Sequence, residues 1–316
     1  MDRRAAAVIM AAGKSTRMKS ALPKAAHPIC GKPMTRHVID ACRQSGISEV
    51  IVVVGHEADK VKSALGEDVL YASQTQQLGT GHACRQALPH VPESTDVVLV
   101  LPGDAPLITA AAITRLLDTH ASENNAATLL TAEMDDPAQY GRVVRGPGGS
   151  VIRIVEARDA DEKTLAINEI NTSIYCFDRG VLERDLAKLT TDNAQGEYYL
   201  TDVIELIRES GGRVGAVVAE DAADTMGINN RMELARANSI MRLRILNELM
   251  LSGVTIADPL TTYVDCDVEI GRDTLIQPFT YIEKGTRVGA NCVIGPFARL
   301  SGVSIPDGTT GVVSNG

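Results

Sequence analysis

The sequence predicts an α/β protein in which a doubly wound, largely parallel sheet is followed by a short parallel β-helix. Two patterns support this. Strand-like apolar runs alternate with amphipathic stretches over the first two thirds, and an aliphatic residue recurs every six positions near the end. With 316 residues, 44% of them apolar and 22% charged, the chain is long enough for two domains with buried cores.

Four continuous apolar or β-branched runs are typical of strands that are covered on both faces. They are AAAVIM (5–10), EVIVVVG (49–55), DVVLVL (96–101) and AATLLTAEM (126–134). Amphipathic stretches at 34–46 and 112–123 lie between them, and this alternation predicts a Rossmann-like, doubly wound sheet. Further strands are expected at 151–156, 171–177 and 214–219, and a helix at 230–250.

A six-residue repeat begins at Val264. Its aliphatic positions are Val264, Ile270, Ile276, Ile282, Val288, Ile294 and Leu300. Small or β-branched residues follow four positions later, at Val268, Thr274, Thr280, Thr286, Cys292, Ala298 and Ser304. One hexad cannot bury its own apolar face, so stacked coils are favoured over the alternative of ordinary sandwich strands. We expect a first domain at 1–229, a linker helix at 230–252, a β-helix of about two coils at 253–305, and a loose tail at 306–316.

Composition excludes several functional classes. The formal net charge of −9 argues against nucleic acid or an anionic membrane as the main partner. No apolar run approaches the roughly 18 residues of a membrane span, and residues 5–12 are too short for a secretory signal. The six cysteines are scattered without CxxC spacing, which favours reduced thiols and a cytoplasmic protein.

The first apolar run ends in a glycine turn that is locally positive. Gly13 is followed by Lys14, Arg17, Lys19 and Lys24. Ligands of open α/β sheets bind at the carboxyl ends of strands, where exposed N–H groups can hold phosphate oxygens. The spacing matches neither GxGxxG nor GxxxxGK[ST], and the charge suits a polyphosphate better than a nicotinamide cofactor. The alternative is a solvated basic loop.

Further motifs carry a resemblance over roughly residues 5–250 and into the hexads. They are AAGKSTRM, LPK, QLGTGHA (77–83), LPGDAPL (101–107), YGRVV (140–144), IVEARDA (154–160), EINTSIY (169–175), NAQGEYYLTD (193–202) and GINNR (227–231). In this order the chain resembles the bacterial bifunctional N-acetylglucosamine-1-phosphate uridyltransferase/glucosamine-1-phosphate acetyltransferase family. The resemblance implies an enzyme that converts UTP and N-acetylglucosamine 1-phosphate to UDP-N-acetylglucosamine and pyrophosphate, with a left-handed β-helix.

The resemblance also implies roles on the nucleotide side. Arg17 and Lys24 are the expected catalytic cations, gripping the leaving pyrophosphate and the α-phosphate. The remaining nucleotide-binding residues are Ala11, Ala12, Gly13, Lys14, Gln74, Gly79 and Thr80. The amide of Gln74 can meet the edge of uracil. His82 is expected to be structural, since no step of this mechanism needs an imidazole.

For the metal, the resemblance implies that Asp104 and Asn229 hold Mg²⁺, with phosphate oxygens and water completing its coordination. The alternatives are a turn residue at Asp104 and a helix N-cap at Asn229 or Asn230, with the cap preferred for Asn230. The expected sugar-binding residues are Gly141, Glu156, Asn171, Tyr199 and Thr201. For Glu156 and Asn171 the alternative is polar residues at a strand edge.

The sequence departs from the family pattern at Ser15 and Pro102, where the family usually has a glycine and an aromatic or polar residue. No histidine follows His120, and Ser301 stands where the family has an arginine, so we expect no acetyl transfer. The family further implies a homotrimer through the β-helix. The other functions left open are a different sugar-1-phosphate nucleotidyltransferase and a noncatalytic paralogue that binds nucleotide-sugars.

Overall fold

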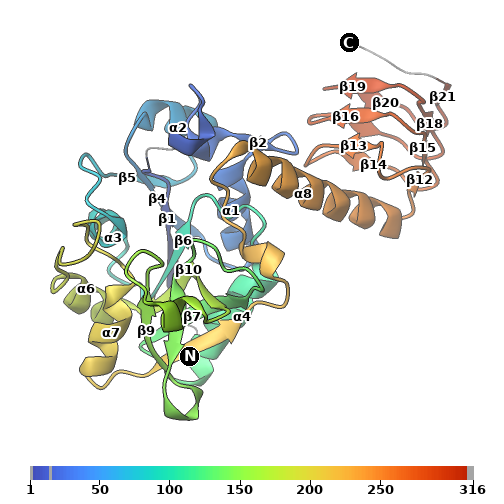
Figure 1. The fold of residues 1–316 in the computed structure, drawn as a ribbon. Coiled ribbons are helices and arrows are strands. Elements are labelled where there is room, and N and C mark those ends of the chain that lie inside the picture. The colour runs from blue at the N-terminus through green and yellow to red at the C-terminus, as the bar shows by residue number, and fades with distance from the viewer. Residues whose placement is uncertain (1–2, 14–15, 312–316) are drawn as a thin grey trace. The chain divides into compact units, whose positions relative to one another are not determined.

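The computed structural model describes residues 3–13 and 16–311 and divides them into two compact units (Figure 1). The first unit contains the described parts of 1–27 together with 34–229. The second contains 28–33 together with the described part of 230–316. A short segment near the start of the chain therefore groups with the C-terminal part, which the expected domain at 1–229 did not anticipate.

The first unit is built on one nine-stranded sheet. Seven strands follow the order β11-β7-β10-β6-β1-β4-β5, and β8 and β9 extend it from β10. The strands are β1 (Ala5–Met10), β4 (Glu49–Val54), β5 (Leu70–Ser73), β6 (Val97–Pro102), β7 (Ala127–Glu133), β8 (Arg142–Arg145), β9 (Val151–Val155), β10 (Glu169–Asp178) and β11 (Val214–Val218). The pairs formed by β1, β4, β5 and β6 are parallel, whereas β10 runs antiparallel to both β6 and β7.

Helices cover both faces of this sheet. They are α1 (Met34–Gln44), α2 (Ala58–Leu65), α3 (Thr80–Ala87), α4 (Ala110–Ser122), α5 (Glu162–Leu165), α6 (Arg179–Leu186) and α7 (Asp202–Glu209). Along β1, Ala6 and Val8 pack with residues of α3, α6 and α7, whereas Ala7 and Ile9 pack with residues of α1, α2 and α4. Alternate side chains of one strand thus enter different cores, which confirms the doubly wound α/β prediction.

The strand order reverses beside β1. The chain goes from β1 to β4 and β5 on one side, and β6 then lies on the other side of β1. The loops that leave β1 and β6 diverge at this point, so their carboxyl ends leave an opening at the sheet edge. The described part of the unit also contains short 3₁₀ turns, namely η1 (Thr16–Met18), η2 (Lys24–Ala26), η3 (Leu88–His90), η4 (Pro147–Gly149) and η5 (Ala222–Thr225).

The second unit combines a long helix, a small hairpin and the hexad region. The helix α8 (Arg231–Leu251) begins at Asn230, whose Oδ1 accepts from the N–H groups of Met232 and Glu233, as the preferred N-cap reading of Asn230 expects. The hairpin pairs β2 (Pro28–Ile29) with β3 (Lys32–Pro33). Its Cys30 donates its backbone N–H to Asn238 of α8 over 3.0 Å and accepts one from Cys266 over 2.9 Å.

The hexads form a left-handed parallel β-helix, as predicted, with three sheets of four, three and three strands. Its strands are β12 (Thr255–Ile256), β13 (Tyr263–Val264), β14 (Glu269–Ile270), β15 (Leu275–Ile276), β16 (Tyr281–Glu283), β17 (Arg287–Val288), β18 (Val293–Ile294), β19 (Arg299–Ser301), β20 (Ser304–Ile305) and β21 (Thr310–Gly311). Ile276, Ile282, Ile294 and Leu300 are fully buried, and the threonines at 274, 280 and 286 are 0–1% exposed.

Two details differ from the sequence-based expectation for this region. Stacking begins at β12, before the first recognisable hexad, so the described coils number three rather than about two. The loose tail expected from residue 306 is also wrong for residues 310–311, because β21 pairs with β18. Asp307 supports this continuation by accepting the backbone N–H of Ala290 over 2.8 Å.

None of the helices in the described part of the chain has the length and apolar character needed to cross a membrane.

A buried histidine links α4 to the sheet and predicts acid sensitivity. His120 is 1% exposed, with Nδ1 at 3.0 Å from Thr128 Oγ1 and Nε2 at 3.2 Å from Asp178 Oδ1, which also accepts from Arg3. Burial lowers the pKa of His120 below 6.5, although Asp178 opposes this shift. Below about pH 6.5 the unfolded chain therefore takes up a proton that the native histidine resists, and stability falls as the pH falls.

We expect His120→Gln to make the unfolding free energy less dependent on pH between 7 and 5, as measured by urea denaturation. His90→Gln, at an exposed histidine of η3, is the matched control and should retain the wild-type slope. An unchanged slope in His120→Gln would contradict this account.

Candidate functional site

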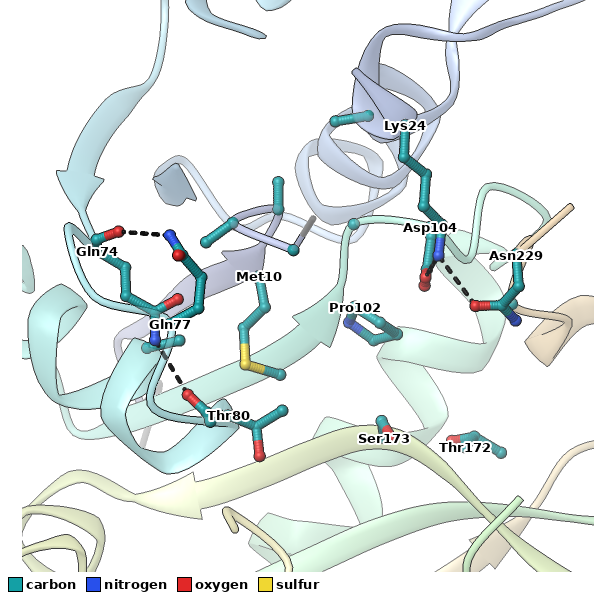
Figure 2. A pocket seen from close by; sticks show the side chains of 18 of the residues that line it. Met10, Lys24, Gln74, Gln77, Thr80, Pro102, Asp104, Thr172, Ser173 and Asn229 are labelled. Carbon is teal, nitrogen blue, oxygen red and sulfur yellow. Dashed lines mark hydrogen bonds and ion pairs between the residues drawn. The ribbon is translucent and has the colours of Figure 1, made fainter. Parts of the chain in front are cut away.

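A pocket of about 770 Å³ opens where β1 and β6 end (Figure 2). The predicted residues that line it are Ala11, Ala12, Gly13, Lys24, Gln74, Gly79, Thr80, Asp104 and Asn229. They come from six separate segments of the chain, yet all lie at the carboxyl edge of the sheet. Lys14 and Ser15 lie outside the described residues.

Backbone hydrogen bonds fix the loops that carry these side chains. After β1, the N–H of Ala11 donates to Val53 of β4 over 2.9 Å, and after β6 the N–H of Gly103 donates to Met10 over 2.9 Å. The N–H of Ile228 then donates to the carbonyl of Asp104 over 2.9 Å. This last bond brings the segment that carries Asn229 beside the end of β6.

Two cations meet two oxygen ligands on one side of the pocket. The ammonium of Lys24 forms an ion pair with Asp104 Oδ2 and donates to Asn229 Oδ1 over 3.1 Å, as Figure 2 shows. Arg17 donates to the same Asn229 oxygen over 2.9 Å. The side chains of Lys24 and Asp104 are only 17% and 29% exposed. Arg17 does not itself line the pocket but is bonded to a residue that does.

The same pair of oxygens suits a divalent cation. Because Lys24 Nζ contacts both Asp104 and Asn229, a carboxylate and an amide oxygen converge on one cationic position. Mg²⁺ is commonly held by only one or two protein oxygens and keeps water and phosphate as its other ligands. No cluster of three or more histidine, cysteine, aspartate or glutamate residues that could hold a metal occurs in the described ranges. The assignment of Asp104 and Asn229 to a metal stays a prediction.

The opposite side of the pocket presents an amide and the start of a helix. Gln74 follows β5, is 4% exposed, and donates from Nε2 to the carbonyl of Gly79 over 3.0 Å. Gly79 has φ +106°, and a Cβ there would lie 2.6 Å from the carbonyl oxygen of Tyr198, so only glycine fits. Thr80 accepts the N–H of Leu200 over 3.0 Å through its hydroxyl.

The residues predicted to bind a sugar lie together but do not line this pocket. Thr201 Oγ1 lies 3.4 Å from Glu156 Oε1, and the N–H of Asn171 donates to the carbonyl of Gly141 over 2.8 Å. Glu156 is largely buried, and this raises the pKa of its carboxyl group above the usual range, although Thr201 opposes the shift. Their assignment to a sugar site stays a prediction.

A bulge in β10 explains why Asn171 does not face the pocket. The pairing with β7 shifts between Asn171 and Ile174, and Ser173 adopts φ +62°. The side chain of Asn171 supports this distortion by accepting from the N–H of Ser173 and donating to the Tyr175 hydroxyl over 2.7 Å. The neighbours Thr172 and Ser173 line the pocket instead, as Figure 2 shows.

Tyr199 belongs to a set of contacts that joins two loops. Its hydroxyl accepts from Gln195 over 2.9 Å and lies 3.4 Å from Asp159 Oδ2. Asp159 also accepts the N–H of Ala194 over 2.9 Å, and Arg158 donates to the side chain of Gln195 over 2.9 Å. These contacts hold the segment after β9, which carries Glu156, against the segment before α7.

The sequence analysis missed several lining residues, among them Met10, Gln77, Tyr140, Thr172, Ser173 and Glu197. Met10 directly precedes the predicted Ala11, and the others lie inside motifs quoted above, so these motifs were the available signal. Thr172 and Ser173 reach the pocket through the bulge in β10, which depends on how β10 pairs with β7. Pro102, noted as a departure, also lines the pocket.

Comparisons with known proteins identify the family of the chain. Residues 7–171 match the family described as MobA-like NTP transferase domain, and residues 267–302 match the bacterial transferase hexapeptide family of six repeats. The first match covers more than half of the chain and contains most of the pocket. The chain belongs to the NTP transferase family and is by family a nucleotidyltransferase.

More specific relatives cover nearly the whole chain. A protein named bifunctional protein GlmU from Brevibacillus brevis is 48% identical over 96% of this chain, and one from a Geobacillus species is 50% identical over the same share. The matched region is 66% of each relative, so the chain spans about two thirds of their length. These relatives confirm the family resemblance inferred from the motifs.

A solved structure has a similar fold over three quarters of the chain. A putative glucose-1-phosphate thymidylyltransferase from Bacillus anthracis superposes with a TM-score of 0.61 at 21% identity, covering 75% of this chain and 94% of its own. At this identity the likeness shows the fold alone.

Glu156 lies near two further carboxyl groups, those of Asp159 and Asp202, and the three are called the acidic group around Glu156. We expect this group to lower the free energy of unfolding at neutral pH. Burial, followed by Glu205 and Asp159, raises the pKa of Asp202 from 3.8 to about 6. Native Asp202 therefore releases its proton less readily than the unfolded chain, and stability falls as the pH rises from about 4 through 6. We expect Asp202→Asn to raise the melting temperature at pH 8 by a few degrees, but not at pH 4.

Scanning calorimetry at both pH values checks this, with Asp192→Asn as a control at an exposed aspartate. An equal effect at pH 4 and pH 8 would assign the change to something other than the carboxylate charge.

Proposed function

We propose that the chain catalyses the transfer of a uridylyl group from UTP to N-acetylglucosamine 1-phosphate, giving UDP-N-acetylglucosamine and pyrophosphate. The observation that carries this proposal is the convergence of Lys24 and Arg17 on Asp104 and Asn229 at the reversal of strand order. A nucleoside triphosphate carries the negative charge that two such cations can bind. The relatives named GlmU and the motif resemblance support the choice of this reaction within the family.

The proposed chemistry relies on cations and amides and does not need a general base. A sugar-phosphate oxygen attacks the α-phosphorus of UTP and forms one P–O bond, while the bond from the α-phosphorus to the bridging oxygen breaks and pyrophosphate leaves. The attacking oxygen is already anionic at neutral pH, because the second ionisation of a phosphate monoester lies near pH 6. Positioning and charge neutralisation are therefore the main tasks of the protein.

Named residues would divide these tasks. Lys24 and Arg17 would neutralise phosphate oxygens, and backbone N–H groups of residues 11–13 would add donors beside them. Asp104 and Asn229 would hold a Mg²⁺ ion, which when bound neutralises phosphate charge and orients the triphosphate. Gln74 would meet uracil, and the group around Glu156 would accept hydrogen bonds from the sugar.

Two other functions can be distinguished from this one by experiment. A different base or sugar is compatible with the same cations, and the thymidylyltransferase of similar fold illustrates that this fold occurs with other substrate names. A noncatalytic nucleotide-sugar-binding protein is disfavoured by the paired Lys24 and Asp104. We also propose a homotrimer through the β-helix and a cytoplasmic location, and the expected absence of acetyl transfer stays a prediction to be tested with acetyl-coenzyme A and glucosamine 1-phosphate.

Replacing the acidic oxygen ligand tests the metal role. We expect Asp104→Asn to lower kcat by roughly 10²–10³-fold, because a neutral amide neutralises less of the cation's charge and binds it more weakly. Circular dichroism should show an intact fold. Asp118→Asn, on the covering helix α4, is the control, and near-wild-type turnover in Asp104→Asn would remove this residue from the site.

Substrate choice tests the proposed reaction itself. A pyrophosphate-release assay that crosses four nucleoside triphosphates with several sugar phosphates should give the highest kcat/KM with UTP and N-acetylglucosamine 1-phosphate. Glu156→Gln should raise KM for the sugar phosphate about tenfold while KM for UTP changes little, because the charge-assisted acceptor is lost. Equal rates with glucose 1-phosphate, or with every triphosphate, would refute the assignment.

A further inference from the structure

The amide of Gln74 is held from two sides. Its Nε2 lies 3.0 Å from the carbonyl oxygen of Gly79 and 3.0 Å from Nδ1 of His82. A primary amide has two N–H groups, so these two acceptors use both of its donors. Gln74 lines the pocket, and its Oε1 accepts no hydrogen bond from any residue that the structure describes. The acceptor end of the amide is therefore the end left for a ligand.

His82 is itself held in a defined place. It belongs to the first turn of α3, whose start is fixed because Gly81 donates its N–H to the carbonyl of Tyr198 over 2.8 Å. On the other side of the ring, Nε2 lies 3.3 Å from the amide nitrogen of Gln86, one helical turn further on. To accept from Gln74, Nδ1 carries no proton, so the neutral ring has its proton on Nε2. Because two N–H donors cannot bond each other, the Gln86 amide then has to turn its oxygen, and not its nitrogen, toward Nε2–H.

We propose that His82 is a positioning residue that sets nucleobase selectivity by fixing the orientation of the Gln74 amide. This inference rests on the proposed nucleotidyl transfer at this pocket. An amide oxygen that faces the base accepts a hydrogen bond from the N3–H of uracil or thymine. Cytosine has an unprotonated N3 at the same position, so it places a second acceptor against Oε1 and is rejected.

The alternative amide orientation shows what His82 contributes. Rotation by 180° would place Oε1 against two acceptors, Gly79 O and His82 Nδ1, and would turn the N–H groups toward the base. That orientation would favour cytosine over uracil. Removing the acceptor at residue 82 leaves Gly79 alone to oppose rotation, and the loss of one hydrogen bond shifts such an equilibrium by roughly tenfold.

The test compares His82→Phe with His82→Asn. Phenylalanine keeps a ring but has no acceptor, whereas asparagine can place Oδ1 near the position of Nδ1. The measured quantity is the ratio of kcat/KM for UTP to that for CTP. We expect the ratio to fall about tenfold in His82→Phe and to stay within about threefold of wild type in His82→Asn. His90→Phe, the same change at an exposed histidine, should leave the ratio unchanged.

Binding provides a second readout that does not need turnover. Isothermal titration with UTP and CTP should show the same loss of preference in His82→Phe, and the melting temperature reports whether the variant is folded. If wild type prefers UTP and His82→Phe keeps the full preference in binding or turnover, His82 is structural only and the proposal is overturned. If wild type instead uses a purine triphosphate, the proposed function fails, and that outcome is read from wild type alone.

Discussion

Burial of the sheet on both faces is the constraint on which the rest of the first unit depends. Side chains of β1 enter two different cores, so neither face of the strand has room for a charged group. Polar chemistry is therefore confined to the edge where strands end, and the reversal of order between β4, β1 and β6 separates the loops there. The pocket follows from this topology, and residues as distant in sequence as Ala11 and Asn229 are neighbours because their segments end at the same edge.

At that edge of the sheet, a lysine and an aspartate neutralise each other's charge. Asp104 is less than one third exposed, and an unpaired carboxylate there would be costly, but Lys24 neutralises it and also bonds Asn229. The acidic group around Glu156 is arranged differently, since burial raises the pKa values of Glu156 and Asp202 without a paired cation of this kind. The two groups of residues thus differ in electrostatic character, because the charges of Lys24 and Asp104 balance each other whereas the carboxyl groups near Glu156 are buried at a cost to stability.

Sequence patterns predicted the features that depend on local periodicity. The run at 5–10 coincides with β1, and the hexads coincide with the buried positions Ile276, Ile282 and Ile294, because strand burial and coil stacking each impose a repeat on neighbouring residues. Features set by distant partners were not predictable in this way. The bulge at Ser173 depends on how β10 pairs with β7. His82, which the sequence analysis expected to be structural, contacts Gln74 only after α3 is placed beside the end of β5.

The hairpin at 28–33 has a consequence for how the chain can be divided. It lies early in the sequence but belongs to the second unit, so the backbone passes between the two units three times. A gene fragment that encodes residues 1–229 would retain Ile29 and Cys30 while discarding Asn238 and Cys266, to which Cys30 is hydrogen-bonded, and Ile29 is fully buried in the intact chain. Each unit is compact in space, but neither consists of one continuous stretch of the sequence. Recombination or subcloning that respects the fold has to cut at more than one place.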